Sequence, residues 1–491
     1  MILSPDICQR ALGARDARFD GLFFVGITTT RVYCRPVCPS RRAAPSHRRF
    51  FDSAASAEGA GFRPCLRCRP ELAPGRAVID AVPRLARLAA LRISAGALNG
   101  HGVAELAREL GVSERHLRRA LERELGVSPV ALAQTHRLLF AKRLLADTSL
   151  PVTRIAFASG FQSLRRFNSL FRERYRLSPS ALRRAPGLAR RPPRAPPAAA
   201  AQDVVKVTLA YRPPLAWDAL TGQLGSDALP GVEVVQGARY GRTVCIDGRT
   251  GVVWAEDAPE RSHVNVEVAP ALLPVLMSLV ARLRHLFDLD AEPTVVDAHL
   301  AQGGLCDLVR RRPGLRIPGA LDGFEVAFRE LLRGSGRPAA RGRDLAGRVV
   351  AELGERLDAG LPTLSRLAPC AARVAAAGAS RLIGLGVPQR RADAIAAVAR
   401  AVTDGALRLE PGSDISATHR ALRELSGIGD RLATTIVMRA LYWPDAFPAS
   451  DPALRRAAGA PGPGALRARA EQWRPWRAYA ALHLWLQDAE R

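Results

Sequence analysis

The sequence predicts a multidomain protein that is mainly α-helical with α+β parts. Three observations support this fold class. The chain has 491 residues, enough for three or four domains. Its hydrophobic pattern changes from helical to strand-like and back to helical. A segment rich in proline, alanine and arginine separates the first helical stretch from the strand-like stretch, and its composition predicts a linker. We therefore divide the chain into five parts: 1–76, 77–184, 185–203, 204–317 and 318–491.

The charge balance indicates a polyanionic partner. Lysine and arginine total 72 against 46 acidic residues, for a formal net charge of +26. Residues 80–191 hold 21 basic and 8 acidic residues, which is half of that excess. The first residues lack the basic and apolar regions of a signal peptide, and no apolar run is long enough to span a bilayer. We expect a cytoplasmic, nucleoid-associated bacterial protein with reduced cysteines and no membrane partner.

Four cysteines in the first part, Cys34, Cys38, Cys65 and Cys68, form two close pairs. Three and two residues lie inside the pairs, and 26 residues separate them. This is zinc-ligand spacing, because each pair can hold one edge of a tetrahedron. We predict one four-cysteine zinc site and no organic cofactor. Spacing alone favours a closed structural site over a reactive one. The remaining cysteines are scattered and are expected to be ordinary thiols: Cys8, Cys245, Cys306 and Cys370.

The second part contains two similar helix-turn-helix units. Gly111 and Gly160 stand at matching turn positions, and Ser113 can cap the helix that follows the first turn. An ordinary bundle with a basic face is the alternative, but two matching turns followed by arginine-bearing helices favour insertion into DNA major grooves. The candidate DNA-binding residues on the second helices are Arg115, Arg118, Arg119, Ser163, Arg165, Arg166 and Asn168.

The segment GFQSLRRFNSLFRERYRLSPSALR, residues 160–183, resembles the signature of the AraC-type DNA-binding domain. The resemblance implies that both second helices enter successive major grooves of promoter DNA. Which arginines contact bases and which contact phosphates stays open.

The segments TTTRVYCRPVCPSR (28–41) and FRPCLRC (62–68) resemble the N-terminal domain of Ada-type adaptive-response proteins. The resemblance covers about residues 1–75. It implies that the four cysteines bind zinc and that Cys34 accepts a methyl group from a methylphosphotriester in DNA. Nothing in the chain resembles the second methyltransferase domain of that family, so direct repair of O6-methylguanine is not expected.

The chemistry of a zinc-thiolate cluster is consistent with this role. Zinc keeps the sulfurs as thiolates at neutral pH, and a thiolate is the nucleophile. Four thiolates on Zn²⁺ carry a formal charge of −2, so methylating one removes negative charge and should strengthen DNA binding. We expect nearby arginines to offset the cluster charge and to bind the phosphate backbone: Arg35, Arg41, Arg42 and Arg63.

Beyond the linker, four segments have strand-like patterns. They are 204–211, 242–247, 252–255 and 263–268, with a turn at Asp247-Gly248. From Pro270 onward the pattern is helical.

LSGIGDRLA, residues 425–433, predicts a helix-hairpin-helix turn. Gly427 and Gly429 allow tight turns, and the helix start that follows can hold a DNA phosphate. The candidate DNA contacts are Gly427, Ile428, Gly429 and Arg431. Asp451 lies 22 residues after Gly429, and this combination resembles the DNA glycosylase superfamily.

Further segments resemble AlkA-type 3-methyladenine glycosylases: FDL (287–289), RPGLRIPG (312–319), GVPQRRADAI (386–395) and WRPWRAYAALHLW (473–485). The resemblance spans about residues 204–491. It implies an antiparallel α+β lobe, a helix-hairpin-helix catalytic domain and Asp451 as the catalytic carboxylate. Asp451 precedes Pro452 and also suits a helix N-cap, a role compatible with catalysis.

Two departures from the AlkA pattern bear on activity. The stretch 331–344 has no large apolar residue near Ser335, where relatives carry a wedge that fills the gap left by a flipped base. Arg431 stands where tryptophan or, in lyases, lysine is common. Arginine cannot form a Schiff base, so we expect no lyase activity, and stacking on a cationic base should be weaker. Four aromatic residues are expected in the core or the pocket, with the core favoured for most: Trp473, Trp476, Tyr479 and Trp485.

Two hypotheses follow. In the first, a monomeric protein binds double-stranded DNA, transfers a methyl group to Cys34 and contacts the transcription machinery to activate repair genes. It also hydrolyses the N-glycosidic bond of alkylated purines of the 3-methyladenine and 7-methylguanine class. In the alternative, a non-enzymatic regulator has a structural zinc site and a degenerate glycosylase-like half.

Overall fold

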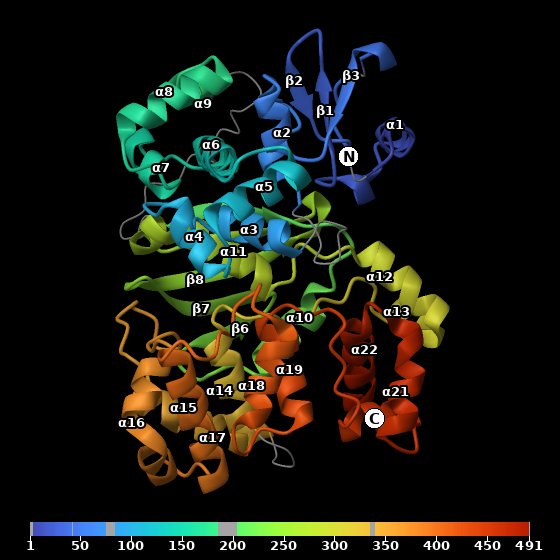
Figure 1. Cartoon of the computed structure of the whole chain (residues 1–491). Coiled ribbons are helices and arrows are strands. Elements are labelled where there is room, and N and C mark those ends of the chain that lie inside the picture. Colours follow the sequence, from blue (N-terminus) through green and yellow to red (C-terminus); the bar gives the residue numbers. More distant parts are fainter. Residues whose placement is uncertain (1–2, 42, 75–83, 185–203, 334–338, 491) are drawn as a thin grey trace. The chain divides into compact units, whose positions relative to one another are not determined.

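The computed structural model describes residues 3–41, 43–74, 84–184, 204–333 and 339–490 (Figure 1). It confirms a mainly helical chain with antiparallel sheet parts. Two compact units are present: Met1–Arg212 with His263–Ala281, and Pro213–Ser262 with Arg282–Arg491. The expected linker 185–203 lies outside the described residues. Among the described residues, no helix combines the length and hydropathy needed to cross a membrane.

The N-terminal part of the first unit is a small four-stranded sheet in the order β3-β1-β2-β4. Strand β1 pairs antiparallel with β2 and β3, and β4 pairs in parallel with β2. T-shaped contacts between Phe24 and Tyr33 and between Phe51 and Phe62 form its core. These strands are too short to show a period of two in the sequence. The elements are α1 (Pro5–Ala14), β1 (Phe24–Ile27), β2 (Val32–Cys34), β3 (Arg48–Phe51), α2 (Ala54–Gly59) and β4 (Arg63–Pro64).

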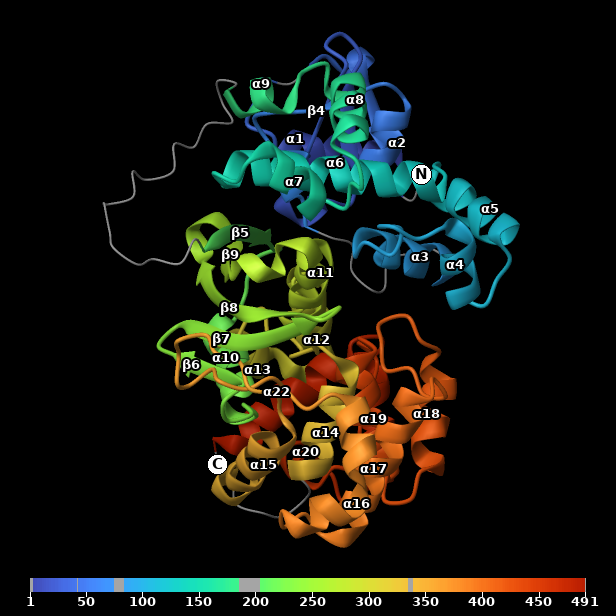
Figure 2. The same cartoon turned by 90° about the vertical axis from the view of Figure 1, so that its left-hand side faces the viewer.

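The two helix-turn-helix units follow. Gly111 and Gly160 have φ of +69° and +81°, which confirms the expected turn glycines. Ser113 and Ser163 each cap the next helix by accepting a backbone N–H. Figure 2 shows α6 as a long helix that connects the two helix-turn-helix units, and α6 contacts both α5 and α7. The helices are α3 (Arg84–Ser94), α4 (Val103–Glu109), α5 (Glu114–Leu125), α6 (Pro129–Asp147), α7 (Val152–Ala158), α8 (Leu164–Tyr175) and α9 (Pro179–Arg184).

The four expected strands after the linker are confirmed, and one more is present. Strand β5 (Val205–Ala210) pairs antiparallel with β9 (His263–Val268). Strand β7 (Arg239–Ile246) pairs antiparallel with β8 (Arg249–Ala258) and with β6 (Glu233–Gln236), which the sequence pattern did not predict. The Asp247-Gly248 turn has φ of +48° and +71°, as a tight hairpin requires. Helix α11 (Leu276–Leu286) contains residues of both units.

The second unit is otherwise helical. Helix α14 packs against α17 and α19, and α18 lies beside α19 (Figure 1). A second apolar cluster surrounds the buried Trp473 and includes residues of α20 and α22. The helices are α10 (Trp217–Ser226), α12 (Pro293–Leu300), α13 (Cys306–Arg311), α14 (Gly323–Arg333), α15 (Ala339–Leu353), α16 (Ala371–Gly384), α17 (Gln389–Thr403), α18 (Ile415–Glu424), α19 (Asp430–Ala440), α20 (Pro452–Ala457), α21 (Pro463–Ala470) and α22 (Arg477–Ala489).

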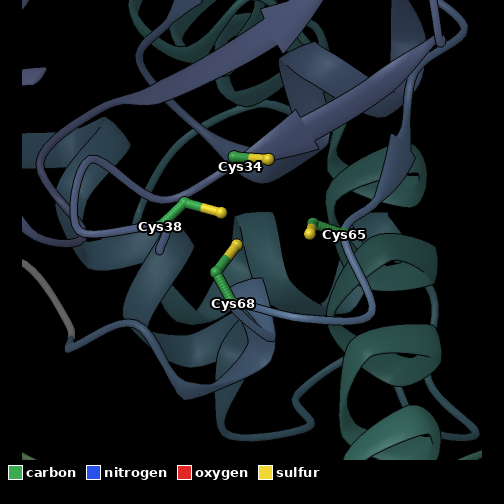
Figure 3. Close-up of side chains that lie close together, drawn as sticks. All are labelled: Cys34, Cys38, Cys65 and Cys68. Carbon is green, nitrogen blue, oxygen red and sulfur yellow. The ribbon is translucent and has the colours of Figure 1, made fainter. Parts of the chain in front are cut away.

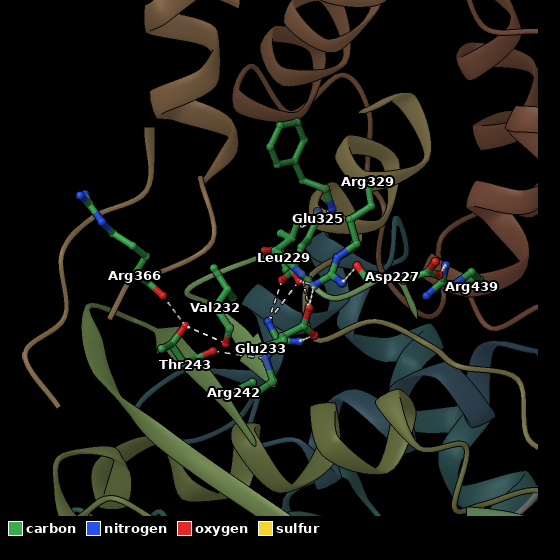
Figure 4. A network of polar contacts seen from close by, with 12 residues as sticks. Asp227, Leu229, Val232, Glu233, Arg242, Thr243, Glu325, Arg329, Arg366 and Arg439 are labelled. Atoms are coloured by element: carbon green, nitrogen blue, oxygen red, sulfur yellow. Dashed lines mark hydrogen bonds and ion pairs between the residues drawn. The ribbon is translucent and has the colours of Figure 1, made fainter. Parts of the chain in front are cut away.

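A buried ion-pair network connects β6 and β7 to α14 (Figure 4). Arg242 contacts Glu233 at 3.2 Å and Glu325 at 2.9 Å, and Arg329 contacts both carboxylates. Burial alone would raise the pKa of Glu325, but the two guanidinium groups lower it to about 2. Removing one member would leave an uncompensated buried charge, which typically costs about 3–5 kcal/mol.

A buried carboxylate, Asp288, lies in the same unit. Tyr479 Oη donates to it at 2.8 Å, the Ile317 N–H donates at 3.2 Å, and Tyr442 Oη also donates. Burial raises the pKa of Asp288 from its ordinary value to about 6 despite these donors. The folded state therefore favours the protonated acid. This contribution to stability is complete below about pH 4 and is lost as the pH rises through about 6.

We expect Asp288→Asn to remove this pH dependence. Relative to the variant, the wild type should lose about 2 kcal/mol of stability between pH 4 and 7, since one pKa unit corresponds to about 1.4 kcal/mol and part of the effect is already lost at pH 4. Asparagine is neutral and tolerates the φ of +50° at this position. All six tryptophans lie in the second unit, so urea unfolding followed by tryptophan fluorescence reports on it.

His285 and His483, whose pKa values burial lowers to about 4, titrate in the same range with the opposite sign. Both are present in the wild type and the variant, so their contributions cancel in the difference. A difference in unfolding free energy that stays constant from pH 4 to 7 would contradict the prediction.

Candidate metal centre and candidate active site

The four paired cysteines converge in the N-terminal sheet (Figure 3). Cys34 ends β2, and Cys65 directly follows β4. The four Sγ atoms lie within 4.8 Å of one another. A tetrahedral zinc ion with Zn–S bonds of about 2.3 Å would place its sulfurs about 3.8 Å apart. Hydrogen bonding to Cys38 raises the pKa of the Cys34 thiol, as expected for clustered sulfurs that a divalent cation would otherwise hold as thiolates. The donor set therefore fits zinc.

Cys34 differs from the other three ligands. Cys38, Cys65 and Cys68 are buried, whereas Cys34 is half-buried. Backbone N–H groups of Arg35 and Arg67 donate to the sulfurs of Cys68 and Cys65, at 3.4 Å each. Within the described residues, no backbone N–H donates to Sγ of Cys34. Such hydrogen bonds reduce the charge on a sulfur. Within the described residues Cys34 and Cys38 both lack them, and of these two Cys34 is the more exposed residue.

The arginines near the cluster have different surroundings. Arg35 donates from Nε to Asp20 at 2.8 Å and from Nη1 to the Cys68 carbonyl at 3.2 Å. This half-buried side chain therefore supports the loop and is not free to bind the DNA backbone, contrary to expectation. Arg41 is exposed and Arg63 is half-buried. Arg42 lies outside the described residues.

A buried lysine connects the zinc ligands to α6. Lys142 Nζ donates to the Cys65 carbonyl at 3.4 Å and pairs with Glu71. Arg69 pairs with Glu71 at 3.0 Å and with Asp147 at 2.8 Å. The sequence analysis missed this cluster. One signal was present, because Lys142 is one of only two lysines in a chain that otherwise uses arginine.

The candidate contacts on the helix-turn-helix units lie on α5 and α8. Arg118 and Asn168 are half-buried, and Arg118 pairs with Glu114 on the same helix. Ser163 caps α8, so its hydroxyl already has a backbone partner. The exposed members are Arg115, Arg119, Ser163, Arg165 and Arg166.

The predicted hairpin joins α18 to α19. Gly427 has φ of +89°, and a Cβ there would lie 3.1 Å from both the Ala394 Cβ and the Arg390 carbonyl oxygen. Gly429 is the N-cap of α19 and faces open space, and no side chain of the described residues caps that helix. The N–H groups of its first turn are therefore suited to an anion. Ile428 was expected to contact DNA, but its side chain is in the core and its N–H bonds to the Leu425 carbonyl.

Asp451 is the buried N-cap of α20. Its Oδ1 accepts the N–H groups of Ala453 at 2.9 Å and Leu454 at 3.2 Å, and Trp485 Nε1 at 3.3 Å. Its Oδ2 lies 3.5 Å from Arg431 Nη1, at the start of α19. One oxygen is thus held by three donors, while the other faces the hairpin.

The aromatic residues divide between core and site. Trp473, Trp476 and Tyr479 are core residues, as expected for most of the set. Trp485 is half-buried, and its hydrogen bond to Asp451 makes it part of the site. Most of the stretch 331–344 is helical, because α14 extends to Arg333 and α15 begins at Ala339. Ser335 lies outside the described residues.

Three domain families match the chain. Residues 7–71 match the metal binding domain of Ada, residues 106–185 a helix-turn-helix domain, and residues 206–322 the AlkA N-terminal domain. A Mycobacterium tuberculosis protein named as a probable bifunctional transcriptional activator/DNA repair enzyme AlkA is 38% identical over 97% of this chain and 95% of its own length. Escherichia coli DNA-3-methyladenine glycosylase 2 is 33% identical over 57% of this chain and 97% of its own length. The Escherichia coli activator and repair enzyme Ada is 33% identical over 29% of this chain and 38% of its own length.

The fold and the two sites define a protein that joins a four-cysteine metal centre and helix-turn-helix units to a helix-hairpin-helix part similar to DNA-3-methyladenine glycosylase 2. The chain belongs to the family of bifunctional transcriptional activator/DNA repair enzymes of the AlkA type.

Proposed function

We propose that the second unit hydrolyses the N-glycosidic bond of alkylated purines of the 3-methyladenine and 7-methylguanine class. The observation that carries this proposal is Asp451, whose Oδ1 is fixed by three donors and whose Oδ2 faces the hairpin. An alkylated purine is cationic and leaves readily once flipped out of the helix. A fixed carboxylate beside C1′ stabilises the positive charge that develops on the sugar, and water then adds to that carbon.

We propose simple hydrolysis without strand cleavage. The position after Asp430 is Arg431, and an arginine cannot form the Schiff base of a lyase. The test is incubation of methylated duplex DNA with the intact protein, with free 3-methyladenine and strand breaks measured separately. Base release should produce a strand that breaks only after alkali treatment. No release above that of Asp451→Asn would favour the non-enzymatic alternative.

We propose that the zinc centre accepts a methyl group from a DNA methylphosphotriester. The Cys34 thiolate would attack the methyl carbon, forming an S–C bond as the C–O bond breaks and the electron pair returns to the phosphate oxygen. The accessibility of Cys34 supports its role as the acceptor. The loss of one negative charge would strengthen DNA binding and turn damage into activation of repair genes.

We propose that the protein acts as a monomer at the nucleoid, with the transcription machinery as a partner.

We expect exposure to DNA containing methylphosphotriesters to add one methyl group at Cys34. Tryptic peptide Val32–Arg41 contains both Cys34 and Cys38, so fragmentation in the mass spectrometer must locate the methyl group. Unmethylated duplex DNA is the control, and bound zinc is measured in the same sample. A methyl group on Cys38, or an unmodified peptide from zinc-loaded protein, would contradict the prediction.

A further inference from the structure

We propose that Arg431 extends the range of the glycosylase site from cationic bases to neutral bases that leave as anions. This inference rests on the proposed glycosylase function. Its starting point is the 3.5 Å contact between Arg431 Nη1 and Asp451 Oδ2. The site therefore contains a fixed positive charge beside its carboxylate, where a charge-selective pocket for cationic bases would contain only the carboxylate.

The position of Arg431 relative to a bound base follows from covalent geometry. The carboxylate must lie close to C1′ to stabilise the developing positive charge, and the base nitrogen is bonded directly to C1′. A guanidinium in contact with that carboxylate is then within reach of the base. The Arg431 side chain is 34% exposed against 11% for Asp451, so it has room to turn toward a base while the carboxylate stays fixed.

The charge of the leaving base decides the effect. A base alkylated at a ring nitrogen enters with a positive charge and is repelled by the guanidinium. When it departs as a neutral molecule, it gains nothing from a nearby cation.

A neutral base behaves differently. When its C1′–N bond breaks, the electron pair goes to the base nitrogen and the base leaves as an anion. Arg431 can donate a hydrogen bond to that anion and remains protonated throughout. Asp451 faces the sugar cation, water adds to C1′ and loses its proton to solvent, and the base anion takes a proton from solvent.

The competing role for Arg431 is contact with the DNA backbone alone. Such a contact would affect every substrate equally, because the phosphates are the same whichever base is damaged. A change in the ratio of rates between two lesions therefore distinguishes the two roles.

The test compares single-turnover release from two duplexes that differ only in the damaged base, 7-methylguanine as the cationic lesion and hypoxanthine as the neutral one. In Arg431→Gln, the ratio of the hypoxanthine rate to the 7-methylguanine rate should fall by about tenfold or more. The matched control is Arg423→Gln, which removes an exposed arginine near the hairpin that pairs with Asp430, at 3.8 Å, and not with Asp451. Its ratio should equal that of the wild type.

An unchanged ratio in Arg431→Gln, with both rates measurable, would overturn this inference and leave the glycosylase proposal standing. Equal reductions of both rates would assign Arg431 to the DNA backbone and also overturn it. If the wild type released neither base above the level of Asp451→Asn, the proposed glycosylase function itself would fail. Tryptophan fluorescence of each variant confirms that the second unit is folded.

Discussion

Replacing Asp451 with asparagine is expected to lower the rate of base release by about 10²–10³-fold, the range seen when one preorganised electrostatic group is removed from an active site. The substitution removes the negative charge that faces the sugar. It keeps the shape of the side chain and an oxygen that can accept the Ala453 and Leu454 N–H groups, so α20 stays capped. The measurement is single-turnover release of 3-methyladenine from methylated duplex DNA.

Two controls separate chemistry from folding. The thermal midpoint of the second unit, followed by tryptophan fluorescence, should be nearly the same in Asp451→Asn and the wild type. Asp488→Asn changes another carboxylate, one on α22 that pairs with Arg456 at 2.7 Å and not with the hairpin, and it should leave release unchanged. A wild-type rate in Asp451→Asn would show that the carboxylate does not act on the sugar.

Removing zinc is expected to unfold the small sheet around the cysteines. Apparent contributions of structural zinc to small domains are about 10–16 kcal/mol at neutral pH, far more than the total stability of a typical domain. The strands of this sheet are only two to four residues long, and its apolar core is one small cluster. Such a sheet has little stability of its own once its four sulfurs are no longer tied together.

Hydrogen exchange read by mass spectrometry tests this expectation in the intact protein. After chelation, peptides from β1, β2 and β3 should exchange rapidly, while peptides from α14, α17 and α19 keep their protection. Peptides from α6 should lose part of theirs, because Lys142 bonds to the Cys65 carbonyl. Adding zinc back should restore the original pattern. Protected β-strand peptides in the metal-free protein would show that the apolar core suffices to hold the fold.

Predictions from the sequence succeeded where the determining interactions are local. The turn glycines, the Ser113 cap and the Asp247-Gly248 hairpin depend on the conformations of a few consecutive residues, and the structure confirms them. Strand β9 has its predicted bounds because alternation over six residues is a clear pattern. The strands of the N-terminal sheet and strand β6 were not predicted, because two to four residues are too few to show the period of two that is typical of a strand.

Errors arose where a side chain's partner lies far along the chain. Arg35 was expected to contact DNA, but Asp20 and the Cys68 carbonyl hold its guanidinium. Ile428 was placed at the DNA because of its neighbours, while packing puts its side chain in the core. The role of Trp485 was open until the structure placed its indole N–H on Asp451.

By itself, the sequence determined the nature of the two sites. Ligand spacing predicted a four-thiolate zinc centre, and a glycine hairpin with an aspartate 22 residues on predicted a site that resembles those of DNA glycosylases. Only the tertiary structure decided which of the four cysteines is the most exposed, which lysine connects the zinc ligands to α6, and which charge lies against Asp451. The physical reason is how far apart along the chain the interacting residues lie. Metal-ligand spacing and turn conformations are encoded within short segments, whereas the burial and pairing of a charge depend on the side chains that distant segments bring to it.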